Sequence, residues 1–443
     1  MEPILNTLVD QYREEMYEEL AELIRFNTVN DQSTAGENAP YGKANREALD
    51  RVMETGKRLG FEVKDYDGYA ATIGWGTEGK EVGVLSHMDV VPVGDGWNTD
   101  PFDPVIIDGK MFGRGTIDDK GPMIAALYAM KAVKESGLPV KNHMKHIIGC
   151  NEEEGHNCVK YYLTKEKGPD MGFSPDACFG VIHAEKTILR FEISKEWEQM
   201  NTNGLSVEKI EAGTVANAVP NLAKVWLKDA EGNTEVKDFH GVTAHAMCPW
   251  VGENAILPML DYLRGLDLAD DSVKEFFQSL YDLFEDGWEG GNLGIACEDK
   301  LSGKLTMNLG IMEMNEHRGS VKIDIRCPIH SDPQVIIKTV ELACKSKGLH
   351  PEVIYLCDAL YVPKDSELVQ TLLGVYNEMT GRDEVPMTIG GGTYCREVEN
   401  VVSYGPIFPG EPDLAHQANE YIDLENMALA AKIYAQALYE LMK

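Results

Sequence analysis

Five short clusters of acidic residues and histidine hold the side chains that could do chemistry in this sequence. Each stands where an apolar run that predicts a strand ends, or in the loop that follows. Imidazole and carboxylate groups together suit zinc or a similar divalent metal, and one carboxylate can bridge two ions. Two ions about 3.5–4 Å apart can hold a hydroxide and stabilise an acyl transition state, while a further carboxylate moves the proton. The clusters are residues 86–89 (SHMD), 115–121 (GTIDDKG), 152–155 (EEEG), 175–176 (PD) and 415–417 (AHQ).

Taken singly, none of these clusters is specific. A pair such as His87 and Asp89 is common in solvated loops, and an acidic run such as residues 152–154 often begins a helix, where it complements the helix dipole. Asp118 and Asp119 precede a predicted helix, where capping residues are usual. Their setting carries more weight, because ligands of an open α/β sheet bind beyond the carboxyl ends of its strands, where these clusters would converge.

The elements that must position the clusters alternate along the first part of the chain. The run EVGVLSH, which ends at His87, predicts a buried strand. Residues 121–133 predict a helix with Pro122 in its first turn and Gly137 as its stop. A second strand run ends just before the acidic residues, and residues 157–165 predict a short helix. Strands that alternate with helices indicate a largely parallel sheet covered on both faces.

The pattern of predicted strands and helices changes twice along the chain. From about Lys186, shorter strand runs with helices between them indicate a separate α+β domain. After about Tyr361, amphipathic helical patterns return around a glycine-rich loop. The simplest interpretation is an α/β domain of residues 1–185 and 362–443, with a mixed, mostly parallel sheet flanked by helices, and an inserted α+β domain of residues 186–361.

Composition excludes several classes of function. The 443 residues include 41 Lys and Arg against 73 Asp and Glu, a net charge of −32. This argues against nucleic acid and anionic membranes as partners, because both require clustered basic residues. Apolar runs fall well short of the ~20 residues that span a bilayer, and the acidic, amphipathic start of the chain does not resemble a secretory signal. Nine scattered cysteines without a CxxC motif favour reduced thiols, so we expect a cytoplasmic protein.

In their combination and order, these motifs resemble the signature blocks of the M20 metallopeptidases, in particular the bacterial PepV-type dipeptidase branch. The resemblance runs from about Glu18 to the end of the chain. It implies a zinc-peptidase-like catalytic domain with two metal ions, an inserted lid domain, and hydrolysis of the peptide bond of dipeptides. The segments that carry it are SHMDVVPVGDGW, GRGTIDDKGP, NEEEG, SPDACF, GVTAHAMCP, GGGTYCRE and AHQANEYI.

The resemblance also implies a ligand set for two divalent ions, with Zn²⁺ expected first and Mn²⁺ or Co²⁺ as alternatives. His87 and Asp176 would hold one ion. Glu153 and His416 would hold the other, and Asp118 would bridge both. The peptide bond between Asp118 and the next residue would be the cis bond of the family.

Glu152 is then the expected general base, which activates a metal-bridged hydroxide and afterwards protonates the leaving amine. A slip of one residue along the acidic run would instead make Glu153 the base and Glu154 the ligand. Asp89 would hydrogen-bond the second ring nitrogen of His87 and thereby fix its tautomer.

Substrate contacts are implied mainly in the inserted domain. His245 resembles the lid histidine that stabilises the oxyanion, with Asn217 as its polar companion. Arg326 resembles the arginine that binds the C-terminal carboxylate of the substrate. Without the resemblance, His245 would be a satisfied loop histidine and Arg326 a surface charge at a strand edge. Backbone N–H groups for the same carboxylate would come from Gly391, Gly392 and Thr393.

Other functions use the same metal constellation, so the metal ligands do not separate a dipeptidase from an aminoacylase, a desuccinylase or an aminopeptidase. A carboxylate clamp with a closing lid favours small substrates that carry both an amine and a carboxylate. A non-catalytic metal-binding scaffold is the further alternative, and the presence of Glu152 and His416 argues against it. A nucleophile at Cys150 or Cys395 lacks a matching Cys/His motif. We expect a monomer, with a dimer as the alternative.

Overall fold

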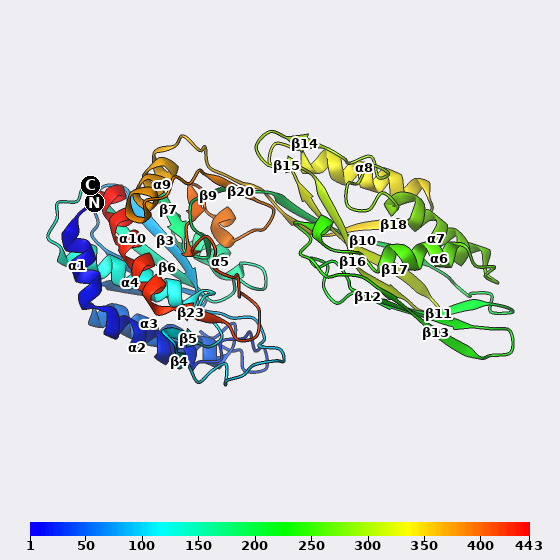
Figure 1. The fold of residues 1–443 in the computed structure, drawn as a ribbon, viewed down its shortest axis with the longest axis horizontal. Coiled ribbons are helices and arrows are strands. Elements are labelled where there is room, and N and C mark those ends of the chain that lie inside the picture. Colours follow the sequence, from blue (N-terminus) through cyan, green and yellow to red (C-terminus); the bar gives the residue numbers. More distant parts are fainter. The chain divides into compact units, whose positions relative to one another are not determined.

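The computed structural model describes residues 1–443 as two compact units (Figure 1). The first unit comprises residues 1–183, 362–387 and 393–443, and the second comprises residues 184–361 and 388–392. The two predicted domain boundaries lie within two residues of those between the units. Residues 388–392 differ from the prediction, because their contacts assign them to the second unit although the sequence pattern assigned them to the first.

A mixed sheet forms the centre of the first unit. Its strand β3 pairs in parallel with β6 and β7, and β21 pairs in parallel with β7. The outer pairs β1–β2, β2–β6 and β21–β9 are antiparallel. The predicted α/β fold with a mixed sheet is thus confirmed, and its parallel part lies at the centre. These strands are β1 (Glu62–Tyr66), β2 (Ala70–Trp75), β3 (Glu81–His87), β6 (His143–Gly149), β7 (Met171–Ser174), β9 (Ile182–Glu185) and β21 (Val401–Ser403).

Helices cover this sheet. The predicted helix is α4, with Pro122 in its first turn, and it packs against α10 (Figure 1). Both are apolar on several faces and are buried along most of their length, as expected of helices inside a large domain. The acidic, amphipathic start of the chain forms two helices that are separated at Tyr12. The helices of this unit are α1 (Pro3–Gln11), α2 (Arg13–Ile24), α3 (Lys43–Arg58), α4 (Lys120–Glu135), α5 (Asn157–Lys165), α9 (Glu367–Thr380) and α10 (Leu424–Met442).

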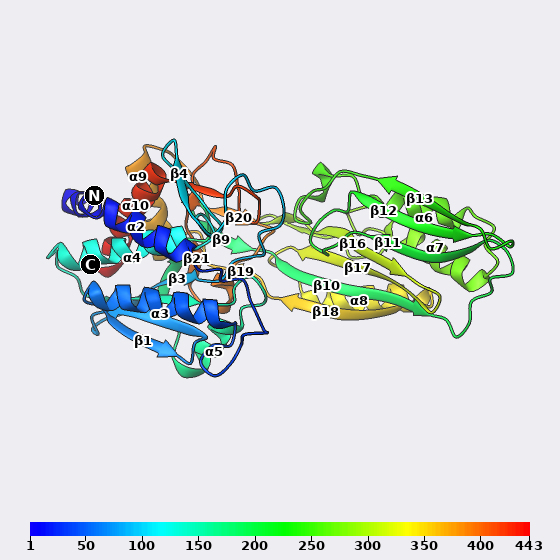
Figure 2. The same cartoon turned by 90° about the horizontal axis from the view of Figure 1, so that it is seen from below.

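The second unit contains a seven-stranded antiparallel sheet in the order β13-β12-β11-β16-β17-β10-β18. Figure 2 shows these strands side by side. Apolar side chains of the sheet and of three helices form one core, so the predicted α+β organisation is confirmed. The elements are β10 (Thr187–Glu196), β11 (Ser206–Ala212), β12 (Leu222–Lys228), β13 (Thr234–His240), β16 (Thr306–Met314), β17 (Arg318–Cys327), β18 (His350–Cys357), α6 (Ile256–Arg264), α7 (Asp271–Phe284) and α8 (Pro333–Ser346).

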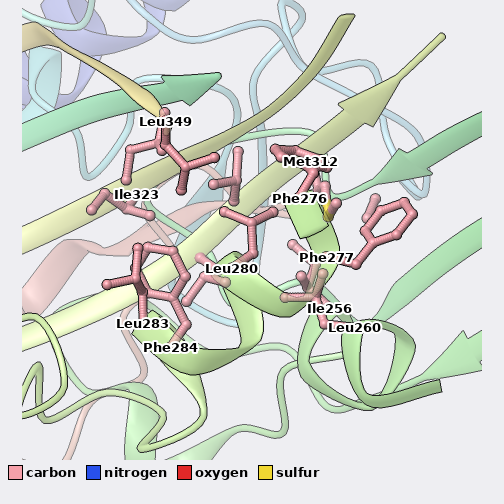
Figure 3. Close-up of a cluster of buried hydrophobic side chains, with 14 of the residues drawn as sticks. Ile256, Leu260, Phe276, Phe277, Leu280, Leu283, Phe284, Met312, Ile323 and Leu349 are labelled. Atoms are coloured by element: carbon pink, nitrogen blue, oxygen red, sulfur yellow. The ribbon is translucent and has the colours of Figure 1, made fainter. Parts of the chain in front are cut away.

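Helix α7 shows how sequence produces this core. The side chain of Asp270 accepts hydrogen bonds from the N–H groups of Ser272 and Val273, which caps the start of the helix. Apolar residues then recur every three or four positions and face the sheet (Figure 3). Each such buried side chain contributes about 1.5–3 kcal/mol. The buried residues labelled in Figure 3 are Ile256, Leu260, Phe276, Phe277, Leu280, Leu283, Phe284, Met312, Ile323 and Leu349.

Short elements complete the chain. Residues 175–186 contain two short strands, β8 and β9. No helix combines the length and the apolar character that crossing a membrane requires. The remaining elements are β4 (Val105–Ile107), β5 (Lys110–Phe112), β8 (Ala177–Cys178), β14 (Glu298–Asp299), β15 (Gly303–Lys304), β19 (Leu360–Tyr361), β20 (Met387–Ile389), β22 (Pro406–Ile407), β23 (Tyr421–Asp423), η1 (Pro249–Val251) and η2 (Tyr394–Glu397).

Candidate metal centre

The expected metal ligands stand at strand ends or in loops of the first unit. His87 is the last residue of β3, and Asp118 precedes α4. Glu153 lies in the loop between β6 and α5, and Asp176 follows β7. His416 lies in the loop before β23.

Asp118 lies between the two imidazoles. Its Oδ1 is 2.9 Å from Nε2 of His87, and its Oδ2 is 3.1 Å from Nε2 of His416. Glu153 Oε2 is 3.1 Å from the same nitrogen of His416. On the other side, Asp176 Oδ2 is 3.7 Å from His87 Nε2. The structure therefore brings the five expected ligands into one cluster, with a carboxylate at the centre as a bridging role requires.

Glu152 lies at the edge of this cluster. Ligand atoms of His87, Glu152 and Asp176 lie within 4.8 Å of one another, as do those of His87, Asp118 and Glu153. The carboxylate of Glu152 is therefore within reach of a group that reacts beside the ligands. Glu154 is exposed and accepts a hydrogen bond from Asn30 instead, so the arrangement favours Glu152 and Glu153 over Glu153 and Glu154 as the base and ligand.

The charges of the cluster suit cations. Burial raises the pKa of Asp176 to about 7, and burial together with Asp118 raises the pKa of Glu153 to about 8. Hydrogen bonds to Asp118 and Glu153 raise the pKa of His416 to about 11. Crowded, buried carboxylates of this kind are stabilised by nearby positive charge, which a metal ion supplies.

Two buried atoms that can bind a metal through a lone pair also indicate that the cluster suits cations. Glu153 Oε1 has no hydrogen-bond partner, which is costly for a buried polar atom unless a ligand satisfies it. His87 Nε2 is buried and faces the carboxylates of Asp118 and Asp176. The other ring nitrogen of His87, Nδ1, is 3.0 Å from the backbone oxygen of Asp89. A carbonyl only accepts, so Nδ1 carries the hydrogen and Nε2 keeps the lone pair that a metal needs. The nitrogen and oxygen donors present fit zinc, manganese or cobalt.

The side chain of Asp89 lies near Nδ1 of His87, as expected, and also holds the loop of the two glutamates. Its Oδ1 accepts the N–H of Glu152 at 3.0 Å, and its Oδ2 accepts the N–H of Glu153 at 3.1 Å. The carboxylate is 3.4 Å from Nδ1 of His87, farther than the backbone oxygen of the same residue. The backbone of Asp89 thus fixes the imidazole, while its carboxylate holds the loop of the two glutamates.

Two contacts hold the loop that carries Asp118. The peptide bond between Asp118 and Asp119 is cis, as the resemblance implied, and Asp119 accepts the N–H of His87 at 3.1 Å. Glu420, which sequence reasoning missed, accepts the N–H groups of residues 115, 117 and 118 at 2.8–3.3 Å. Its other oxygen is 2.6 Å from Arg114. Only its position four residues after His416 could have pointed to Glu420.

Arg326 is buried in the second unit, with 2% of its surface exposed, so the alternative of a surface charge is wrong. Its Nε and Nη2 donate to Asp324, and Nη1 donates to the backbone oxygen of Gly390 at 2.8 Å. Nε of Arg190 also donates to Asp324, at 2.7 Å. Arg326 is therefore bound to the glycine segment that contains Gly391 and Gly392, both of the second unit.

His245 and Asn217 also lie together in the second unit. The backbone oxygen of Asn217 accepts the N–H of Ala246 at 2.8 Å. The N–H of Met247 donates to Nδ1 of His245 at 3.1 Å. Since Nδ1 accepts, a neutral His245 carries its hydrogen on Nε2, which makes that nitrogen a donor, as an oxyanion requires.

Thr393 and the cysteines complete the expected set. Thr393 belongs to the first unit, where its hydroxyl caps η2 by accepting the N–H of Cys395 at 3.3 Å. Cys150 is buried, and burial raises the pKa of its thiol far above the ordinary value. A thiol that resists ionisation is a poor nucleophile, so Cys150 does not favour the cysteine alternative.

Comparison with known proteins identifies the family. Residues 83–440 match the family described as "Peptidase family M20/M25/M40". The chain belongs to this peptidase family. The chain is 36% identical over 463 residues to "Putative dipeptidase YtjP" of Bacillus subtilis (strain 168), with 97% of this chain and 98% of that protein covered. "Putative dipeptidase" of Staphylococcus epidermidis is 35% identical, with 97% and 98% covered.

Solved structures share the fold. The dipeptidase Dug1p from Saccharomyces cerevisiae matches with a TM-score of 0.65 and 15% identity. Human carnosine dipeptidase 1 matches with a TM-score of 0.61 and 16% identity. Each match covers 99% of this chain and 98% of the solved chain. The predicted membership of the M20 peptidases and the predicted fold are thus confirmed.

Proposed function

We propose that this protein is a metal-dependent dipeptidase. The observation that carries the proposal is the cluster of two imidazoles and three carboxylates centred on Asp118, with Glu152 beside it as a further carboxylate. The two relatives named above, both described as dipeptidases, support this choice of substrate class. A hydrolase of acylated amino acids is the alternative, because it would use the same cluster.

The cluster would hold two divalent ions, in the first place Zn²⁺, with Mn²⁺ or Co²⁺ as alternatives. His87 and Asp176 would bind one ion, Glu153 and His416 the other, and Asp118 both. When bound, the ions would polarise the scissile carbonyl and acidify a water molecule.

Glu152 would move the proton. Its carboxylate takes a proton from the attacking water and then delivers it to the departing amine nitrogen. This requires a fixed position, which the hydrogen bond from its backbone N–H to Asp89 supports. The negative charges of the substrate carboxylate and of the oxyanion must also be stabilised, and residues of the second unit would contribute to this.

Residues of the second unit would bind the substrate. Arg326 has five N–H groups, of which the bonds to Asp324 and Gly390 use three. The two that remain, one on each Nη atom, match the two oxygens of a C-terminal carboxylate. Backbone N–H groups of Gly391, Gly392 and Thr393 would bind the same carboxylate. The Nε2 hydrogen of His245 would be donated to the oxyanion, with Asn217 beside it.

The setting we propose is a monomer in the cytoplasm. All nine cysteines are free, which suits a reducing compartment. The family resemblance favours a monomer, because a large inserted lid domain can take the place of a partner subunit.

Hydrolysis of a small panel tests the proposal. The substrates are Ala-Ala, β-Ala-His, a tripeptide, an N-acetyl amino acid and N-succinyl-diaminopimelate, each with chelated enzyme and with zinc or manganese restored. Metal-dependent cleavage confined to dipeptides is the expected result. Cleavage of the acylated substrates alone would keep the metal centre and replace the substrate class, whereas no turnover in protein that binds two ions would favour a scaffold.

A further inference from the structure

A histidine that the ligand set does not use lies against the expected general base. Nε2 of His156 is 3.4 Å from Oε1 of Glu152. On the opposite side of the ring, Nδ1 is 3.1 Å from Oε1 of Glu397. The imidazole is buried, with 8% of the residue exposed. It therefore joins Glu152 to a second carboxylate that is 245 positions away in the chain.

Two separate elements fix this imidazole. His156 stands immediately before α5 with a left-handed backbone, φ 63°, which is uncommon for residues other than glycine. Its N–H donates to the oxygen of Asn151 at 2.9 Å and closes the loop that carries the acidic run. Glu397 ends η2, and Lys160 of α5 lies 3.3 Å from its carboxylate. An unusual backbone conformation persists where its surroundings stabilise it, and such residues are frequent at functional sites.

The two carboxylates determine the charge of the ring. An ionised carboxylate accepts hydrogen bonds and donates none. An imidazole between two of them therefore satisfies both only when each nitrogen carries a hydrogen, that is, as the imidazolium. Burial lowers the pKa of His156, but Glu152 and Glu397 raise it further, to about 9.

We propose that His156 is a positioning residue for the general base. Held by Glu397, it holds Oε1 of Glu152, so that Oε2 is the oxygen that takes and returns the proton. This proposal rests on the base role given to Glu152 under the proposed function. If the ring of His156 only stabilised the start of α5, its replacement in folded protein would leave kcat unchanged.

The variant His156→Gln separates the two roles, because an amide can bond to one carboxylate but cannot carry positive charge between both. We expect kcat to fall by roughly 10–100-fold, as for other residues that orient reacting groups from behind. KM should stay within about twofold, and two ions per chain should remain by elemental analysis. His143→Gln is the matched control, since His143 also faces a carboxylate, that of Glu81, but at the opposite end of β6 from the site. It should behave as wild type.

Glu397→Ala provides a second measurement if His156→Gln does not fold. It should also lower kcat. The double variant should lose little more activity than either single variant, because the two residues act as one unit. Wild-type kcat in either single variant, or loss of bound metal in proportion to kcat, would overturn the positioning role. Additive losses in the double variant would also overturn it. Failure of the proposed function is distinct, because wild-type enzyme would then cleave no dipeptide in the same assay.

Discussion

The two units hold buried charge of opposite sign. In the first, Asp118, Glu153 and Asp176 crowd around two imidazoles, so that carboxylates outnumber the basic groups. In the second, Asp324 lies between Arg190 and Arg326, so that guanidinium groups outnumber carboxylates. Most of these groups are buried, where an unbalanced charge is costly, although the side chains of His416 and Arg190 are 56% and 27% exposed.

This difference shows what each unit needs from outside. Under the proposed function, the first would be completed by cations, which would compensate the excess of carboxylates. Under the proposed function, the second would be completed by an anion, because the pairing of Asp324 with two guanidinium groups leaves one positive charge in excess. A dipeptide carboxylate is such an anion. Changes in the first unit should therefore act on the chemical step, and changes in the second on substrate binding.

Glu152→Gln should have the largest effect on activity. The amide has nearly the same shape but cannot accept a proton, so kcat should fall by about 10²–10⁴-fold. Metal content should be unchanged, because Glu152 lies outside the ligand set. Steady-state kinetics and elemental analysis of the same preparation measure both. Turnover close to that of wild type would exclude Glu152 as the base.

Asp89→Asn should have the next largest effect. Asparagine offers one accepting oxygen where the structure uses two, so one N–H of the Glu152–Glu153 pair loses its partner. We expect turnover to fall by roughly 10–100-fold, the range for groups that orient metal ligands. Asp170→Asn is the control, because Asp170 likewise accepts a backbone N–H, that of Glu81, at 2.9 Å. Equal losses in both variants would contradict a specific role.

Arg326→Lys should act on binding. Lysine keeps the charge but loses the planar fork that matches a carboxylate. We expect KM for dipeptides to rise about tenfold, within the range for one lost charge-assisted hydrogen bond, and KM for dipeptide amides to change little. The control is Arg318→Lys, on the same strand and paired with Glu192. An equal rise for dipeptides and their amides would reject the carboxylate contact.

Leu280→Ala should affect activity least and stability most. The side chain is fully buried in the core of the second unit (Figure 3), so the cavity should lower the free energy of unfolding by about 2–5 kcal/mol. Chemical denaturation measures the loss. Leu342→Ala, an exposed leucine of α8, should change stability by no more than about 0.5 kcal/mol. A large fall in kcat for folded Leu280→Ala would show that the core of the second unit also controls the chemical step.

Local patterns were sufficient for much of the fold. Helix α5 has the bounds that its sequence predicted, and α4 begins one residue before the predicted helix, because capping and apolar spacing act within a few residues. The pattern of predicted strands and helices likewise changes near Lys186 and Tyr361, close to the boundaries between the two units. Local patterns failed where segments meet from afar, as residues 388–392 do with the second unit.

The sequence by itself determined which residue types stand at the strand ends, and in what order. That information was enough to expect the five clusters near one edge of the sheet, because ligands of an open α/β sheet bind beyond the carboxyl ends of its strands. The choice of His87, Asp118, Glu153, Asp176 and His416 within these clusters came from the resemblance to the M20 peptidases. The contacts that hold these residues in position were decided only by the tertiary structure.

Three contacts between distant segments show how the tertiary structure holds the site residues in position. Glu420 holds the loop of Asp118, the carboxylate of Asp89 accepts two backbone N–H groups, and Glu397 reaches His156 across more than 200 residues. Each contact joins segments distant in the chain and depends on burial and on backbone direction. Periodicity and spacing report which face of an element is apolar, but they contain no information about which distant carboxylate will meet which N–H group.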